Sequence, residues 1–309
     1  MANSISVMGK GNVGKKPAER VAEIVFTVCA FAAVAAVASI TLYMIISGTP
    51  ALFQVGIKDI LFSSTWAPTA SDPQYGILNV ILTSIVGTAA AVVIGVPIGV
   101  LTAVFLAETA PKRLASIVRP AVELLAGIPS VVYGLLGLLI LNPVMYKLEL
   151  LIYKGDASHE FTGGANLLSA VLVLAIMILP TVINISESAI RAVPDHLKSS
   201  SLALGATKIQ TIFKVILPAA RSGIAAAVVL GVGRAVGEAM AISLVSGSVV
   251  NFPLPFNSVR FLTTAIVSEM SYSSGVHRQV LFTIGLVLFL FIMIINVVMT
   301  RILKKGAEE

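Results

Sequence analysis

The sequence predicts an all-α polytopic membrane protein with six transmembrane helices. Composition is the first reason, because 57% of the 309 residues are hydrophobic, 12% are charged, and the mean hydropathy is +0.98. Soluble globular chains are about 45–50% apolar and about 25% charged. The net charge of +6 could suggest nucleic acid, but the basic residues gather by loop and form no patch. Cys29, the single cysteine, excludes disulfides within the chain and cysteine metal sites.

Six apolar stretches are long enough to cross a bilayer, which takes about 20 residues. They cover residues 22–47, 77–106, 120–146, 167–190, 219–250 and 277–302. The first run is too long for the hydrophobic region of a signal peptide, so it is expected to be an uncleaved span. Glycines, Pro129 and ionisable residues interrupt the third and fifth stretches. Such interruptions are tolerated where other helices or a water-filled cavity satisfy the backbone, which indicates a transport pathway.

Lysine and arginine are distributed unevenly between the two sides, and this predicts the orientation. One side carries 15 of the 21 basic residues: Lys10, Lys15, Lys16, Arg20, Lys112, Arg113, Arg119, Arg191, Lys198, Lys208, Lys214, Arg221, Arg301, Lys304 and Lys305. The other side carries five: Lys58, Lys147, Lys154, Arg260 and Arg278. Both termini are therefore expected in the cytoplasm. The expected organisation is a cytoplasmic tail (1–21), a first helix (22–47), an external loop (48–76), a core of five helices (77–302) with a cytoplasmic loop (191–218), and a cytoplasmic tail (303–309).

The cytoplasmic loop contains a distinctive stretch, Ser199 to Pro218, which reads SSSLALGATKIQTIFKVILP. Its spacing of Ala203, Gly205, Leu217 and Pro218 resembles the cytoplasmic signature of ABC importer permeases, with three serines where that family usually has Glu-Ala-Ala. The resemblance implies a short helix that docks into an ATPase subunit, with Gly205 at its turn and Pro218 before the next span. The residues implied in this coupling are Ala203, Gly205, Ala206, Leu217 and Pro218.

Three further stretches, Gly233–Ala241 (GRAVGEAMA), Glu123–Gly134 (ELLAGIPSVVYG) and Trp66–Thr69 (WAPT), resemble motifs of the phosphate ABC importer permeases. With the loop stretch, the resemblance covers nearly the whole chain. It implies a type I ABC importer (MetI-like) permease fold in a bacterial inner membrane. It also implies a homologous second permease subunit, an ATPase dimer that binds ATP and magnesium, and an extracytoplasmic phosphate-binding protein. The chain itself would hold no cofactor or metal and catalyse no covalent reaction.

Arg234 and Glu238 are the first candidates for the substrate pathway, because they are four residues apart and would share one face of the fifth span. Ionisable groups inside a membrane usually pair with each other or line a pathway. The pair could simply lock the helix bundle, or Arg234 could contact an anion while Glu238 holds it. The planar guanidinium suits phosphate-like oxyanions. Glu123 is the third candidate, either buried in a span or at the membrane surface, whereas Glu187 and Arg191 are expected to form a surface pair.

Other patterns point away from enzyme chemistry. Residues 9–16 (GKGNVGKK) imitate a phosphate-binding loop, but no strand precedes them as such a loop requires. His159, His196 and His277 lie in loops without partners at metal-ligand spacing. The alternatives that stay open are an ABC permease for another oxyanion (molybdate or sulfate), a secondary transporter that needs no ATPase, and, more distantly, a membrane enzyme.

Overall fold

The computed structural model describes residues 17–156 and 159–308, and it divides into two units after Ile46. Within the described residues, six helical runs are long and apolar enough to cross a membrane, as the sequence predicted. They are Glu19–Gln54, Leu78–Thr109, Ser130–Ile152, Leu167–Arg191, Lys208–Val236 and Gly275–Val298. Residues 9–16, whose sequence resembles a phosphate-binding loop, lie outside the described residues.

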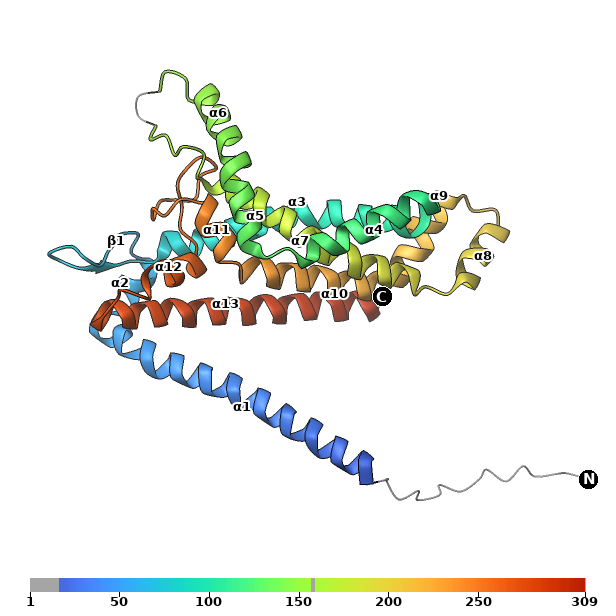
Figure 1. The fold of residues 1–309 in the computed structure, drawn as a ribbon, viewed down its shortest axis with the longest axis horizontal. Helices are drawn as coiled ribbons and strands as arrows, with labels where there is room; N and C mark the ends of the chain where they lie inside the picture. The colour runs from blue at the N-terminus through green and yellow to red at the C-terminus, as the bar shows by residue number, and fades with distance from the viewer. Residues whose placement is uncertain (1–16, 157–158, 309) are drawn as a thin grey trace, which may run out of the picture. The chain divides into compact units, whose positions relative to one another are not determined.

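Each transmembrane run is built from one or more of the helices labelled in Figure 1. The helices are α1 (Pro17–Gln54), α2 (Ile57–Phe62), α3 (Leu78–Val104), α4 (Lys112–Gly127), α5 (Ser130–Leu136), α6 (Asn142–Ile152), α7 (Leu167–Arg191), α8 (Asp195–Ala203), α9 (Lys208–Thr211), α10 (Leu217–Val236), α11 (Met240–Val245), α12 (Leu262–Glu269) and α13 (Gly275–Glu308). The π-helical segments are η1 (Phe105–Thr109), η2 (Gly137–Leu141) and η3 (Ile212–Ile216). A two-stranded antiparallel hairpin, β1 (Trp66–Ala67) and β2 (Gln74–Tyr75), follows α2.

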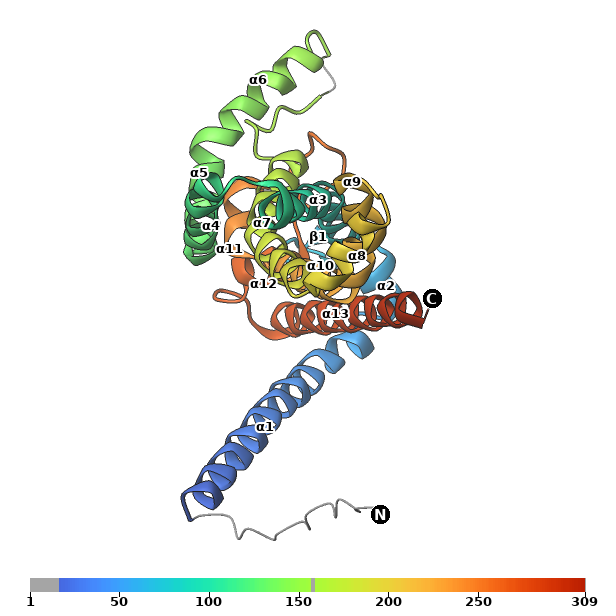
Figure 2. The same ribbon diagram turned by 90° about the vertical axis from the view of Figure 1, so that its right-hand side faces the viewer.

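Helices α3, α7 and α10 form the centre of the second unit, where α7 is the most buried span (Figures 1 and 2). Glycines allow this close packing. A Cβ at Gly95 would lie 2.7 Å from Ile178 of α7, and one at Gly99 would lie 2.8 Å from Val182. Small residues at helix contacts are typical of membrane bundles, where backbones gain stability from close approach.

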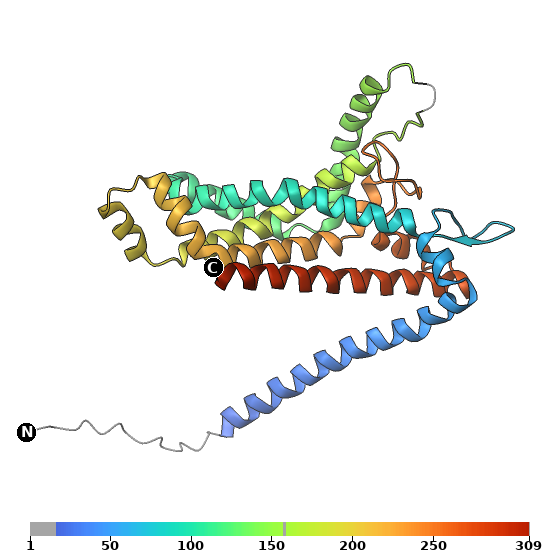
Figure 3. The same ribbon diagram turned by 180° about the vertical axis from the view of Figure 1, so that it is seen from behind.

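The connecting segments gather at the two opposite ends of this bundle (Figures 1 and 3). Helices α8 and α9 lie at one end, whereas α2, the β hairpin and α12 lie at the other. At the hairpin end, the Thr283 hydroxyl of α13 donates a 2.8 Å hydrogen bond to the carbonyl of Gly48. A ligand crossing the membrane would therefore pass from the hairpin end to the α8 end or the reverse.

The third span differs from the prediction of one helix over 120–146. Helix α4 ends at Gly127, Ile128 and Pro129 are non-helical, and the spanning run starts at Ser130. Proline lacks the N–H that would continue the helix, and it forces the preceding residue out of the helical region. Ile128 accordingly has φ −70° and ψ 128°. The residues before this break form a separate helix, α4, and the span extends farther, to Ile152.

The fifth span also differs, because the predicted stretch 219–250 starts too late and is not one helix. The spanning run begins at Lys208 and ends at Val236, and α11 is separate. Pro218 therefore lies inside the run and not before it. The π-helical segment η3 ends two residues before Pro218, and η2 likewise ends two residues before Pro143. In each segment the N–H just before the proline, of Leu217 or Asn142, bonds the carbonyl five residues earlier, of Ile212 or Gly137.

Candidate substrate pathway and coupling segment

Arg234 lies in the last turn of α10, and Glu238 lies in the non-helical break that follows. Both side chains are half-buried. The expectation that they share one helix face is wrong, because α10 ends at Val236. Glu238 Oε1 instead accepts a 2.9 Å hydrogen bond from the N–H of Ala241, which caps α11. Among the described residues, no carboxylate forms an ion pair with Arg234.

A second helix break faces this one. The break at Ile128 and Pro129 leads into α5, and α5 packs against α11 so closely that a Cβ on Gly134 would lie 2.7 Å from the Cα of Ala241. Tyr133 of α5 donates a 2.7 Å hydrogen bond back across the break to the carbonyl of Leu125. Tyr133 also belongs to the same buried cluster as Ala235, the residue after Arg234. Arg234, which has no ion-pair partner among the described residues, therefore lies where two interrupted helices meet.

Glu123 lies on α4, before the third span, and is exposed, so of its two expected places the one buried in a span is wrong. It lines a small pocket of about 260 Å³ together with Arg119, Glu187 and Arg191. Glu187 was expected to form a surface pair with Arg191, but it is buried and also binds a second arginine. Its buried carboxylate accepts from Arg119 Nε at 2.5 Å and from Arg191 Nε at 2.9 Å, so it joins α4 to α7.

The coupling segment, residues 195–211, consists of α8, a turn and α9. Gly205 forms the turn with φ +86°, a left-handed conformation that glycine adopts without strain. The N–H of Ala206 bonds the carbonyl of Ser201, and the N–H of Gly205 bonds that of Leu202, which is the Schellman pattern of helix ends. The turn is closed by a hydrogen bond of 3.0 Å between the hydroxyls of Ser201 and Thr211.

The coupling segment exposes apolar side chains at its tip. Leu204 is 91% exposed and Ile209 is 69% exposed. Ala203 is the last residue of α8 and is exposed as well, whereas Leu217 and Pro218 open α10 one π turn farther along. The predicted coupling residues therefore fall into two places, Ala203 to Ala206 at the tip and Leu217 with Pro218 at its base. A partly apolar protruding tip is typical of a docking surface.

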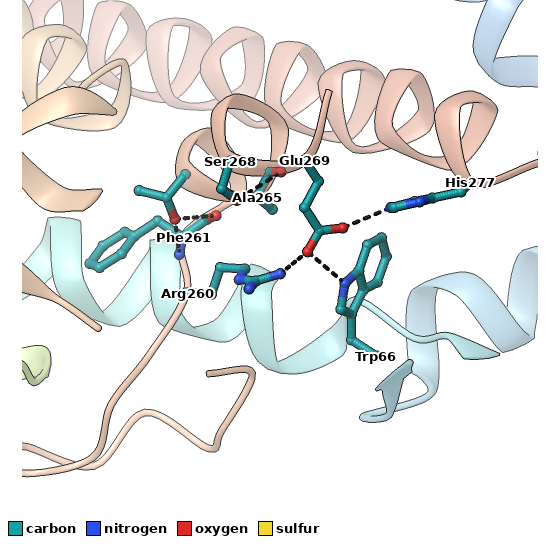
Figure 4. A network of polar contacts seen from close by, with 8 residues as sticks. Trp66, Arg260, Phe261, Ala265, Ser268, Glu269 and His277 are labelled. Carbon is teal, nitrogen blue, oxygen red and sulfur yellow. Dashed lines mark hydrogen bonds and ion pairs between the residues drawn. The ribbon is translucent and has the colours of Figure 1, made fainter. Parts of the chain in front are cut away.

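The opposite end of the bundle holds a polar cluster that the sequence did not predict (Figure 4). Glu269 of α12 is buried and accepts from Arg260, from the Trp66 indole at 3.1 Å and from His277 at 2.7 Å. These contacts tie the β hairpin to α12 and α13. Trp66 and Glu269 are 203 residues apart, so no local pattern could reveal the contact.

The histidines have structural partners. His277 joins the Glu269 cluster, and His159 contacts the fully buried Glu149 at 2.9 Å while it stacks on Tyr153. His196 is exposed on α8. In the part of the chain that the structure describes, no three His, Cys, Asp or Glu side chains gather as metal ligands would.

In the part of the chain that the structure describes, six spans, two helix breaks beside Arg234 and a protruding turn at one end together define a multi-pass membrane permease. Residues 95–306 match the family described as binding-protein-dependent transport system inner membrane component. The chain belongs to this family of ABC transporter permeases, and it is a non-catalytic membrane subunit, with the ATPase a separate protein in such systems.

Individual relatives extend the similarity over most of the chain. It is 39% identical over 287 residues to the probable ABC transporter permease protein YqgH of Bacillus subtilis, covering 90% of each chain. It is 34% identical to the phosphate transport system permease protein PstC of Pasteurella multocida, covering 81% of this chain and 82% of that one.

Solved structures support the fold. The chain resembles a chain of the MetNI methionine ABC transporter with a TM-score of 0.51 and 22% identity, covering 75% of this chain and 94% of that one. It resembles a chain of a bacterial alginate ABC transporter with a TM-score of 0.57 and 16% identity, covering 91% and 97%. The expected MetI-like permease fold is therefore confirmed.

Proposed function

We propose that this chain is one permease subunit of an ATP-driven importer of inorganic phosphate. The observation that carries the proposal is its similarity, over about four fifths of both chains, to relatives named as phosphate transport permeases. The unpaired Arg234 supports it, because burying an arginine in a membrane costs about 2.5–3.5 kcal/mol or more and such residues usually face a pathway. A guanidinium without a carboxylate partner is free to bind a passing oxyanion.

The proposed complex contains a homologous second permease, two ATPase copies and an extracytoplasmic phosphate-binding protein. The ATPases, which bind ATP and magnesium, would dock on Ala203 to Ala206. Their closure would push the coupling segment and open the pathway outward, so that phosphate could pass Arg234. Glu238 would hold the start of α11 in place, and Glu123 would line the cytoplasmic side of the route. The proposed location is the bacterial inner membrane, with both termini in the cytoplasm.

Substrate selectivity tests this proposal. The complex, assembled with its ATPase, second permease and binding protein in proteoliposomes, is expected to accumulate radiolabelled phosphate only when ATP is present. An excess of unlabelled phosphate should compete, whereas molybdate and sulfate should not. If molybdate or sulfate competed and unlabelled phosphate did not, the substrate would be another oxyanion. Uptake without ATP would favour a secondary transporter.

Orientation gives a second prediction, because the charge bias places 48–76 outside and 191–218 inside. Single cysteines at Ser71 and Ser200, both exposed, are introduced in a Cys29→Ala background. An impermeant thiol reagent added to intact cells, with the outer membrane made permeable where one is present, should label the Ser71 position only. Both positions should react once the inner membrane is opened. Labelling of Ser200 and not Ser71 in intact cells would invert the orientation.

A further inference from the structure

The coupling segment is attached to the helix bundle by an ion pair whose carboxylate is buried and whose lysine side chain is 34% exposed. Lys198 Nζ of α8 lies 2.7 Å from Glu108 Oε2 of η1, and the Glu108 side chain is only 6% exposed. Segment η1 forms the corner between α3 and α4. Removing one partner of a buried pair leaves the other charge uncompensated, which is strongly unfavourable. A movement of α8 should therefore carry η1 with it.

The same corner is held from the other side by α4. Arg119 Nη2 donates a 3.0 Å hydrogen bond to the carbonyl of Leu106, two residues before Glu108, while its Nε binds Glu187 of α7. The apolar face of α4 packs on the same corner, since Val122 and Leu106 belong to one buried cluster. Segment η1 is thus fixed to α8 through Lys198 and to α4 through Arg119.

The far end of α4 is attached to the wall of the pathway by Tyr133. The break at Ile128 and Pro129 would otherwise let α4 and α5 move independently, because no helical hydrogen bonds cross it. The Tyr133 hydroxyl donates a hydrogen bond back to the carbonyl of Leu125, and Tyr133 belongs to the same buried cluster as Ala235, the residue after Arg234. A helical stretch of about 9 Å, at 1.5 Å per residue, separates Arg119 from Leu125 and includes Pro120. Contacts that could transmit movement therefore exist at both ends of α4.

We propose that α4 connects the coupling segment to Arg234, with Lys198, Arg119 and Tyr133 as the positioning residues that transmit the movement. The inference rests on the proposed function, because it assigns a route by which an ATPase would act on the anion pathway. The distinctive expectation is a loss of coupling and not of ATP hydrolysis.

The experiment measures phosphate uptake and ATP hydrolysis on the same proteoliposomes that contain the complete complex. Lys198→Glu places two carboxylates face to face, so we expect uptake per ATP to fall about 3- to 30-fold, the range for mutations that alter coupling. ATP hydrolysis should stay within about twofold of wild type. Combining Lys198→Glu with Glu108→Lys restores the pair with reversed charges, and should recover most of the lost uptake per ATP.

Tyr133→Phe is the second variant, because it removes one hydroxyl and keeps the packed ring. It should also lower uptake per ATP. Arg113→Gln is the matched control, since Arg113 is an exposed cation on the same helix, and it should behave like wild type. The proposal is overturned if Tyr133→Phe has the wild-type ratio, or if the charge-reversed pair assembles normally without recovery. If the wild-type complex moves another oxyanion, the same ratio is measured with that ion, so the two proposals fail separately.

Discussion

Replacing Arg234 by methionine is expected to reduce phosphate uptake about 10- to 100-fold, because a hydrogen bond to a charged group contributes about 1.5–3 kcal/mol. Methionine keeps an unbranched side chain of similar length and removes only the charge and the donors. Arg234→Lys should retain part of the activity, because lysine keeps the charge but loses the planar fork. The measurement is uptake of labelled phosphate normalised to the abundance of the assembled complex.

Arg221 supplies the control on the same helix, since it is exposed at the opposite end of α10 and Arg221→Met should preserve uptake. The double change of Arg234→Met with Glu238→Met tests whether the two residues merely neutralise each other. Because the structure shows no ion pair between them, removing both charges should not restore transport. Near-normal uptake in the double variant would mean that Arg234 has only a structural role.

Glu238 should tolerate glutamine better than alanine. Its carboxylate accepts the N–H of Ala241, and a glutamine amide oxygen can accept the same bond. Alanine cannot, so the start of α11 loses its cap at a cost of about 1 kcal/mol. Uptake should fall in the order wild type, Glu238→Gln, Glu238→Ala. Equal loss in both variants would mean that the negative charge itself is required.

The features predicted correctly from sequence are those that depend on local chemistry. Long apolar runs revealed six spans because a bilayer requires about 20 such residues. The turn at Gly205 was predicted as well, and its φ of +86° shows why glycine is present. The interruptions at Pro129 and Gly237 were noted from the sequence, but the bounds of the third and fifth spans were wrong, since hydropathy counts apolar residues on either side of an interruption alike.

The contacts that join distant segments could not be predicted. Arg119 and Glu187 are 68 residues apart, and their pairing depends on how α4 packs against α7. From the sequence, the expected partner of Glu187 was Arg191, four residues away. That pair forms, but Glu187 also binds Arg119. The sequence also could not show that Arg234 and Glu238 do not pair. A spacing of four residues implies a shared face only if the helix continues.

Changing Gly205 to glutamate is expected to abolish transport while the protein still inserts into the membrane. The residue needs a left-handed backbone, and a side chain there would strain the turn by about 1 kcal/mol, too little to unfold a bundle of this size. A Cβ at Gly205 meets no atom of this chain within 4 Å, so a glutamate would point outward beside Leu204. There it would place a charge and the side chain that carries it against a docked ATPase, where an unpaired charge destabilises an interface strongly.

Two matched changes separate the loss of docking from the strain of the turn. Gly205→Asn should largely preserve transport, because asparagine tolerates the left-handed region. Gly155→Glu makes the same chemical change at another glycine with φ +88° and open space around it, in the loop after α6. Membrane abundance should be similar in all three variants, and the ATPase should fail to co-purify only with Gly205→Glu. Wild-type uptake and normal ATPase retention in Gly205→Glu would mean that the ATPase docks elsewhere, since a buried glutamate at this turn could not leave such an interface unchanged.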